Sequence, residues 1–342
     1  MPNKPVFLLF DGNALIHRAF HALPPLTVHA TGEMINGVKG FAQTLLKVIK
    51  DIRPAYWAIS FDRPAPTFRH EKFPQYKQQR PTTPPELVGQ IQRARQLARA
   101  LHLPTFEIDG YEADDVLATL SEKASLQGVT SIIVTGDNDM LQLVDEDITV
   151  LSPRRGFSDT VLYDEEGVLQ KYGLKAEQLI DYKSLVGDNS DNIPGVRGIG
   201  DKTAVKLLQQ FGSIDQIYRK LHEVMPEKLR DLLRENKETV GRNRELVTII
   251  RDTPIVFNLE DCRVSAYDRQ EMVELFRELE FVSLLNSLPQ EFESSSTSAP
   301  AITPPQGDYI IISTGEALEK LSSALGNCAE FCIDLETTGL DE

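Results

Sequence analysis

Carboxylates that follow short apolar runs are the residues of this sequence best placed to do chemistry. In open α/β sheets, ligands bind beyond the carboxyl ends of the strands, and three of the expected strands are followed there by aspartate. Two further acidic motifs are GYEADD, at the start of an expected helix, and GDNSDN. The nine carboxylates of these five motifs are Asp11, Asp62, Glu112, Asp114, Asp115, Asp137, Asp139, Asp188 and Asp191.

Nine carboxylates at one sheet edge would repel one another strongly, so such a site makes physical sense only with divalent cations in it. Oxygen ligands without His or Cys favour Mg²⁺ or Mn²⁺. Two such ions activate a water and stabilise the leaving oxygen of a phosphoryl displacement. Phosphodiester hydrolysis is therefore the leading reaction class. The alternative for each single aspartate is a helix cap or a turn residue.

The elements that must position these groups follow from hydrophobic periodicity. Short apolar runs predict buried strands, and amphipathic segments between them predict helices. This alternation is typical of an α/β unit with a mainly parallel sheet. The expected strands are 6–10, 56–61 and 131–135, and the expected helices are 37–52, 86–101 and 113–125.

Changes along the chain predict its organisation. Residues 1–164 are expected to form the α/β core, and helical patterns dominate a second lobe at 165–290. Residues 291–307 are rich in Ser, Thr, Pro and Ala, a composition typical of a flexible linker. Residues 308–342 are too few to bury a core, so they are expected to be the truncated start of another domain.

A cationic segment at 63–85 interrupts the α/β pattern. Basic residues that track phosphates and rings that stack on bases are the ingredients of a single-strand binding surface. A solvated loop with scattered charges is the alternative. The basic residues are Arg63, Arg69, Lys72, Lys77 and Arg80, and the interleaved aromatic residues are Phe68, Phe73 and Tyr76.

A glycine-rich stretch, IPGVRGIGDKTAVKLL, precedes a further expected helix. Glycines let the backbone turn tightly, and amides at a helix start hold phosphate. The stretch resembles a helix-hairpin-helix at 185–210 that grips duplex backbone, although an ordinary helix-helix turn is the alternative. Its candidate DNA-binding residues are Gly195, Arg197, Gly198, Gly200, Lys202 and Lys206.

The net charge of −15, from 36 basic and 51 acidic residues, argues at first against a nucleic-acid partner. From Glu291 onward the chain holds ten acids and one lysine, which leaves −6 for residues 1–290. Without the nine site carboxylates that part is mildly cationic, at +3. Phosphate binding is therefore expected to rest on local basic patches and to fall with salt.

Cysteine usage and hydropathy indicate the cellular compartment to expect for this protein. The three cysteines, Cys262, Cys328 and Cys332, form no CxxC pair, as suits a reducing cytosol. No apolar stretch reaches membrane-spanning length. A soluble cytoplasmic protein without a membrane partner is expected.

Five motifs in order, FDGNALIHRAF, FRHEKFPQYKQQR, GYEADD, TGDNDML and GDNSDNIPGVRGIGDKTA, resemble the 5′-nuclease domains of bacterial DNA polymerases I, kin to the flap endonucleases. The resemblance covers roughly residues 5–288. It implies a PIN-like α/β fold, with helices on both faces of a mainly parallel sheet, a helical arch and a helix-three-turn-helix lobe. His17, Lys39 and Asn138 depart from the family pattern, and none of them removes a metal ligand.

The resemblance also implies residue roles. Asp11, Asp62, Glu112 and Asp114 would hold one metal ion; Asp114, Asp137, Asp139 and Asp188 would surround another, with Asp115 and Asp191 nearby. Lys77 and Arg80 would contact the scissile phosphate from the arch, to which Arg69, Lys72 and Tyr76 also belong. The hairpin would hold duplex DNA and a potassium ion.

The implied activity is metal-dependent cleavage of 5′ flaps and RNA primers at single-strand/duplex junctions, in replication and repair, by a bacterial cytoplasmic monomer. The tail motif FCIDLETTGL resembles the start of a 3′-5′ exonuclease domain, with Asp334 and Glu336 as its paired carboxylates. The remaining exonuclease motifs and a polymerase domain are absent from the sequence. We therefore expect an amino-terminal fragment of such a polymerase, with Asp334 and Glu336 inactive.

Two other functions compete with this interpretation. A non-catalytic junction-binding module would keep the fold to place a polymerase, but a retired nuclease should have lost some of the acidic set. An α/β ribonuclease of toxin type would have no use for the long cationic segment and the glycine hairpin.

Overall fold

The computed structural model describes residues 4–153, 160–289 and 312–326. The chain divides into two compact units, Met1–Ser294 and Ser295–Glu342. The predicted α/β core and helical lobe therefore fall within one compact unit.

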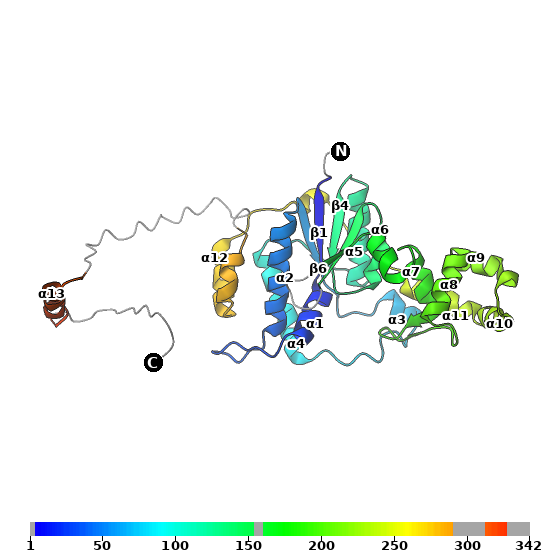
Figure 1. Ribbon diagram of the computed structural model, residues 1–342, viewed down its shortest axis with the longest axis horizontal. Helices are drawn as coiled ribbons and strands as arrows, with labels where there is room; N and C mark the ends of the chain where they lie inside the picture. Colours follow the sequence, from blue (N-terminus) through cyan, green and yellow to red (C-terminus); the bar gives the residue numbers. More distant parts are fainter. Residues whose placement is uncertain (1–3, 154–159, 290–311, 327–342) are drawn as a thin grey trace. The chain divides into compact units, whose positions relative to one another are not determined.

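A six-stranded sheet organises the first unit (Figure 1). Its strand order is β3-β2-β1-β4-β5-β6. Neighbouring strands are parallel from β3 to β5, and β6 pairs antiparallel with β5. The predicted α/β class and mainly parallel sheet are confirmed. The strands are β1 (Val6–Asp11), β2 (Tyr56–Ser60), β3 (Thr105–Phe106), β4 (Thr130–Val134), β5 (Ile148–Pro153) and β6 (Thr160–Tyr163).

The three predicted strands correspond to β1, β2 and β4. Strands β3, β5 and β6 were not predicted individually: β3 has only two residues, and β6 carries no buried residue that would give it an apolar run. The register of the three central strands matters for the site. Asp11 is level with Ser60 on β2, and Phe10 is level with Val134 on β4, so these strands end at one edge.

Helices cover both faces of the sheet because successive strand side chains point to opposite faces. Leu8, Phe10 and Trp57 pack on one face under helices, and Phe7 and Leu9 pack on the other. The helices of the first face are α1 (Gly12–Ala22), α2 (Asn36–Ile52), α4 (Pro85–Ala100) and α12 (Arg269–Glu278), and α5 (Ala113–Ser125) covers the second. Helices α2, α4 and α5 confirm the predictions to within one residue at each end.

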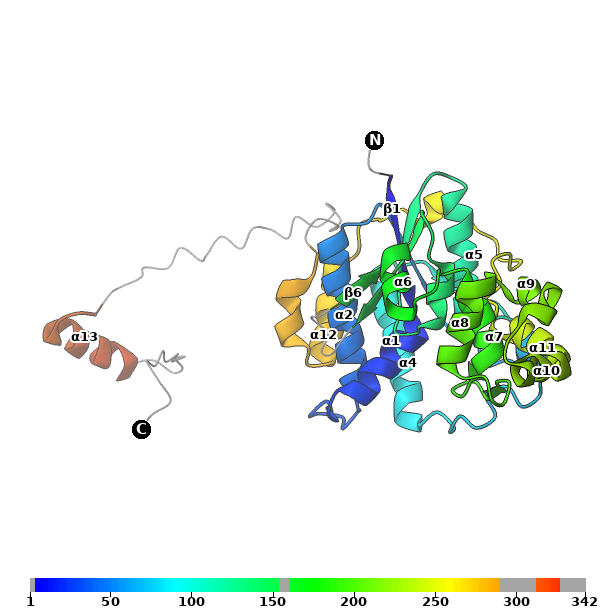
Figure 2. The same cartoon turned by 45° about the vertical axis from the view of Figure 1, so that its right-hand side comes forward.

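Five helices beside the sheet, α7 to α11, form a group that we call the helical lobe (Figures 1 and 2). The second-face core continues into this lobe through residues such as Leu185, Leu207 and Val240. The lobe consists of α7 (Gln178–Val186), α8 (Asp201–Phe211), α9 (Ile214–Arg219), α10 (Glu227–Glu235) and α11 (Lys237–Val247). Helix α12, which was predicted as part of the same lobe, instead packs against α4 with the first-face core.

Short elements complete the fold. Helix α6 (Glu165–Tyr172) precedes the lobe, and β7 (Gly187–Asp188) pairs with β8 (Ile193–Pro194). The cationic segment holds one five-residue helix, α3 (Phe68–Lys72), followed by turns, where a helical arch was expected. The 3₁₀ helices are η1 (Asp139–Leu143), η2 (Leu221–Glu223), η3 (Leu259–Cys262) and η4 (Val282–Ser287).

The second unit is described only at 312–326, where α13 (Gly315–Gly326) lies. The predicted linker at 291–307, the carboxylates Asp334 and Glu336, and Cys328 and Cys332 lie outside the described residues. Within the described ranges, no helix is both long and apolar enough to cross a bilayer.

Cys262 is expected to resist alkylation in the folded protein. Its thiol is buried, and burial together with Asp261 raises its pKa to about 12. Because the thiolate is the reacting species, the reactive fraction stays very small until the pH approaches 12. Peptide mapping after iodoacetamide treatment at pH 8 should find Cys262 unmodified in native protein and modified in urea. Modification of native protein at pH 8 would contradict this expectation.

Candidate active site

Asp11 and Asp62 stand at the shared strand edge. The Asp11 carboxylate caps α1 by accepting a hydrogen bond from the Ala14 amide at 2.9 Å, and it accepts a second from Thr135 Oγ1 at 2.7 Å. The Asp62 carboxylate accepts from the Ala113 amide at 2.8 Å and from Asn13 Nδ2 at 3.0 Å. Asp11 is thus both a helix cap and a site residue. Thr135 and Asn13 are orienting groups that the sequence did not single out.

Helix α5 brings the GYEADD acids to the same edge. Glu112 is the N-cap residue, and Asp114 and Asp115 lie in the first turn, where the helix dipole favours negative charge. Glu112 accepts hydrogen bonds from Lys77 Nζ at 2.7 Å and from the Tyr76 hydroxyl at 3.0 Å. Burial alone would raise the pKa of Glu112, but Lys77 and Arg69 lower it below its ordinary value.

A cleft of about 220 Å³ opens between these elements. Five of the nine predicted carboxylates line it, together with Lys77 and Arg80, and the carboxylates are Asp11, Asp62, Glu112, Asp114 and Asp137. A smaller adjoining hollow shares Lys77, Glu112, Asp114 and Asp137 with the cleft, and Asp139 and Asp191 also line it. The structure therefore brings seven of the nine carboxylates to one place.

Asp188 joins the same group from the helical lobe side. One carboxylate oxygen from each of Asp139, Asp188 and Asp191 lies within 4.8 Å of the other two. Lys183 on α7 forms ion pairs with Asp139 and with Asp188, the latter at 2.5 Å. Burial would raise the pKa of Asp188, and Lys183 lowers it overall. Sequence reasoning missed Lys183, whose only signal is its place in the last turn of a helix that leads into GDNSDN.

The raised pKa values of several buried site carboxylates are what a site for divalent cations should show. Burial raises the pKa of Asp11 to about 7, with Asp62 and Asp137 adding to the effect. Burial raises the pKa of Asp139 to about 7 as well, chiefly with Asp137. Asp114 is raised well above its ordinary pKa by burial and then by Asp11 and Asp137. Carboxylates held so close need positive charge to ionise together, and an oxygen-only donor set suits Mg²⁺ or Mn²⁺.

Asp115 lies below the cleft rather than in its lining. Its carboxylate accepts two hydrogen bonds from the Arg69 guanidinium, at 2.7 and 2.8 Å. It also accepts from the amides of Glu112 and Ile250. The side chains of Arg69 and Asp115 are 3% and 0% exposed, so Arg69 serves the protein interior here rather than an open DNA-binding surface.

The turns after α3 carry Lys77 and Arg80 to the carboxylates. The Lys77 amide donates to the Asp191 carbonyl at 2.9 Å, and its ammonium meets Glu112. The Arg80 guanidinium pairs with Asp191 at 2.5 Å. The buried Tyr76 hydroxyl bonds both Glu112 and Asp191, at 3.0 and 2.9 Å. Exposed Lys72 pairs instead with Glu245 of α11 at 2.8 Å.

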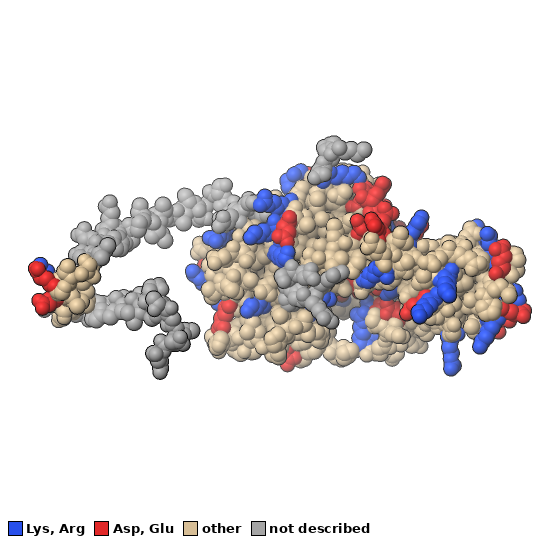
Figure 3. Space-filling model, viewed as in Figure 1, with Lys and Arg blue, Asp and Glu red and all other residues tan. Residues whose placement is uncertain are grey.

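The glycine hairpin connects α7 to α8 and directly follows the GDNSDN motif. A Cβ atom on Gly195 would stand 2.1 Å from the Val186 carbonyl oxygen, so only glycine fits. Gly198 has a φ of +100° and Gly200 is the N-cap of α8. Arg197, Lys202 and Lys206 are exposed. On the face shown in Figure 3, both signs of charge mix over the lobe.

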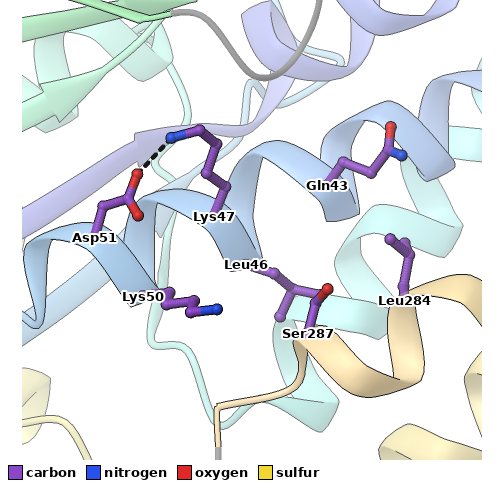
Figure 4. Close-up of a pocket in the computed structure, with 7 residues that line it drawn as sticks. All are labelled: Gln43, Leu46, Lys47, Lys50, Asp51, Leu284 and Ser287. Carbon is purple, nitrogen blue, oxygen red and sulfur yellow. Dashed lines mark hydrogen bonds and ion pairs between the residues drawn. The ribbon is translucent and has the colours of Figure 1, made fainter.

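Another cavity, of about 550 Å³, lies between α2 and η4. Figure 4 shows Leu46 and Leu284 on its two sides and Lys47 paired with Asp51 at its edge. Its lining holds one carboxylate and none of the predicted site residues, so it contributes nothing to the carboxylate chemistry.

Two family models match consecutive parts of this chain. Residues 6–173 match the family model "5′-3′ exonuclease, N-terminal resolvase-like domain", and residues 174–270 match "5′-3′ exonuclease, C-terminal SAM fold". DNA polymerase I of Bacillus caldotenax is 41% identical over 297 residues, which cover 87% of this chain and 34% of that protein. DNA polymerase I of Bacillus subtilis is 40% identical over 291 residues, 85% of this chain and 33% of that protein. The chain spans about a third of the length of these curated relatives.

Solved structures share the fold. A flap endonuclease of bacteriophage T5, in complex with DNA and metal ions, superposes with a TM-score of 0.61 at 21% identity, covering 80% of this chain and 99% of that one. The catalytic core of Rad2 with a DNA substrate gives a TM-score of 0.52 at 16% identity, covering 81% and 88%.

Proposed function

This chain belongs to the 5′-3′ exonuclease family, and from that premise we propose that it is a structure-selective, two-metal 5′ nuclease. Its substrates are 5′ flaps and RNA primers at single-strand/duplex junctions. The observation that carries the proposal is the convergence of seven carboxylates from both halves of the first unit on a cleft that Lys77 and Arg80 also line.

The position of each site residue indicates its proposed role. Asp11, Asp62, Glu112 and Asp114 would hold one Mg²⁺ or Mn²⁺ ion, and Asp114, Asp137, Asp139 and Asp188 would hold the other, with Asp191 beside it. When bound, such ions supply Lewis-acid stabilisation and a nucleophile at neutral pH. Thr135 and Asn13 orient Asp11 and Asp62 through the hydrogen bonds described above.

The chain's own cations act on the phosphate. Lys77 and Arg80 present positive charge where charge develops on the scissile phosphate, which stabilises the transition state more than the ground state. Lys183 keeps Asp188 ionised, as the lowered pKa of Asp188 indicates. Asp115 and Arg69 bind backbone groups at the start of α5 and the end of α11, and they do not contact substrate in this proposal.

DNA binding is proposed to use the exposed basic residues around the cleft. Arg197, Lys202 and Lys206 would contact the duplex backbone, with the hairpin glycines allowing close approach and a potassium ion held by backbone carbonyls. Lys72 would bind phosphates of the single strand. The potassium ion and the duplex contact rest on the resemblance of the hairpin motif.

The relatives suggest the wider setting. Because the matched relatives are bacterial DNA polymerases I, we propose that the chain acts as the monomeric nuclease part of such a polymerase, in replication and repair of cytoplasmic DNA. The 3′-5′ exonuclease resemblance of the tail supports this assignment.

A labelled flap tests the proposed function directly. Incubation of a 5′-labelled flap with the protein and Mg²⁺ should yield cuts at the junction, and excess chelator should abolish them, because the carboxylates need divalent cations to act. Equal cleavage with and without chelator would contradict the metal mechanism. Junction binding without any cleavage would support the alternative of a non-catalytic module.

A further inference from the structure

A third, small apolar cluster joins the cationic segment to the helical lobe. Its buried members are Tyr76, Ile193, Leu246 and Val247, and Phe73 packs against them. It is separate from the two clusters that fill the sheet faces. The cationic segment that carries Lys77 and Arg80 is therefore packed on the lobe and does not hang free.

Helix α11 contributes most of the lobe residues that contact the cationic segment here. The Arg69 guanidinium donates to the carbonyls of Leu246 and Thr248, each at 2.9 Å. One turn earlier, the Arg242 guanidinium lies 4.8 Å from the centre of the Phe73 ring. Arg242 is half-buried, and within the described ranges its buried Nε has no hydrogen-bond partner. Its Nη2 donates a hydrogen bond to the Asn243 side-chain oxygen at 3.4 Å, and the Phe73 ring face is the second partner of this partly desolvated cation.

The same turn of α11 is tied to the glycine hairpin. The side-chain Nδ2 of Asn243, a fully buried residue, donates to the Ser184 carbonyl at 3.2 Å and to the Pro194 carbonyl at 2.8 Å. Phe73 in turn begins the turns that end at the site, since the Tyr76 amide donates to the Phe73 carbonyl at 2.8 Å. Arg242 therefore stands between the hairpin and the segment that carries Lys77.

We propose that Arg242 is a positioning residue, whose guanidinium on the Phe73 ring holds residues 73–80 in the place that presents Lys77 and Arg80 to the scissile phosphate. The part about the phosphate rests on the proposed function. The anchoring itself is a property of the fold and is testable without nuclease activity.

Trypsin measures the anchoring, since the Lys77–Gln78 bond within this segment is a tryptic site. In Arg242→Met, cleavage after Lys77 should become about fivefold faster than in the wild type, because the segment opens more often once the partly desolvated cation–π contact is lost. Phe73→Leu should have a similar effect. Lys237→Met is the matched control, because Lys237 is also on α11 and its ammonium lies 5.6 Å from the centre of another ring, that of Tyr218 on α9. This variant should leave cleavage after Lys77 unchanged.

Flap cleavage then tests the link to catalysis. Arg242→Met should lower the single-turnover rate about fivefold with flap affinity unchanged in chelator, and Arg242→Lys should recover most of the rate, since a cation remains over the ring. The double variant with Phe73→Leu should be no slower than either single variant.

The outcomes separate the competing explanations. Unchanged trypsin cleavage in both Arg242→Met and Phe73→Leu overturns the proposal, whatever the nuclease assay gives. Weaker flap binding with an unchanged single-turnover rate also overturns it, because Arg242 would then be a phosphate contact. Faster trypsin cleavage with no flap cleavage even by the wild type upholds the anchoring and refutes the proposed function.

Discussion

Asp114→Asn is expected to slow flap cleavage by about a thousandfold or more, equivalent to about 4 kcal/mol in the barrier. Asp114 borders both the cleft and the adjoining hollow, so it is placed to serve both of the proposed ion sites. The side-chain shape is kept and only the charge is lost. Cleavage of a 5′-labelled flap in Mg²⁺, under single-turnover conditions, measures the effect.

The same variant should melt at a higher temperature than the wild type in chelator. Burial and the neighbouring acids raise the pKa of Asp114 far above normal, which means that its charged form is unfavourable in the folded protein. Flap affinity in chelator should change little. Asp109→Asn is the matched control, since Asp109 is exposed and pairs with Arg63; it should keep full activity. Parallel loss of binding and cleavage in Asp114→Asn would mean that the carboxylate is structural.

Asp115→Asn is expected to lower the free energy of unfolding by about 3–5 kcal/mol, as breaking one side of a buried ion pair does. The Arg69 guanidinium would keep its contacts with the Leu246 and Thr248 carbonyls. Burial lowers the pKa of Arg69, and Asp115 raises it. The Asn variant would remove this stabilising partner from the buried guanidinium. Urea unfolding in chelator measures the loss.

A surface pair gives the comparison for Asp115. Glu245→Gln removes the partner of Lys72, where both side chains are more than half exposed, and should cost under about 1 kcal/mol. A direct metal role for Asp115 predicts a different pattern. In that case, stability in chelator would be unchanged, and the stabilisation by added Mg²⁺ would shrink.

The strand ends were predictable because local patterns specify them. Apolar runs bounded by turn residues located β1, β2 and β4, and amphipathic spacing located α2, α4 and α5. Since parallel strands end at a common edge, the carboxylates after them were expected to meet, and Asp11, Asp62 and Asp137 do line one cleft. Strand β6 was harder to predict because it is a half-exposed edge strand, where burial imposes little hydrophobic pattern on the sequence.

Other features depend on contacts between segments far apart in the sequence. Arg69 and Tyr76 were predicted to bind DNA from an arch, yet both are buried here against residues 36 to 179 positions away. Lys183 was missed because nothing in its own helix marks it as the partner of Asp139. Burial and pairing of charged groups are not visible in the local sequence.

The sequence by itself determined the fold class, the order of the elements and the set of acids, because strand and helix periodicity and side-chain chemistry are local properties. Only the tertiary structure decided which acids border the cleft and which one, Asp115, lies beneath it paired with Arg69. It also decided that Lys77 and Arg80 meet the carboxylates through turns packed on α11. Those outcomes depend on long-range packing, which decides which charged groups lose their hydration and which partners they gain in return. Both are settled only when the whole chain is folded.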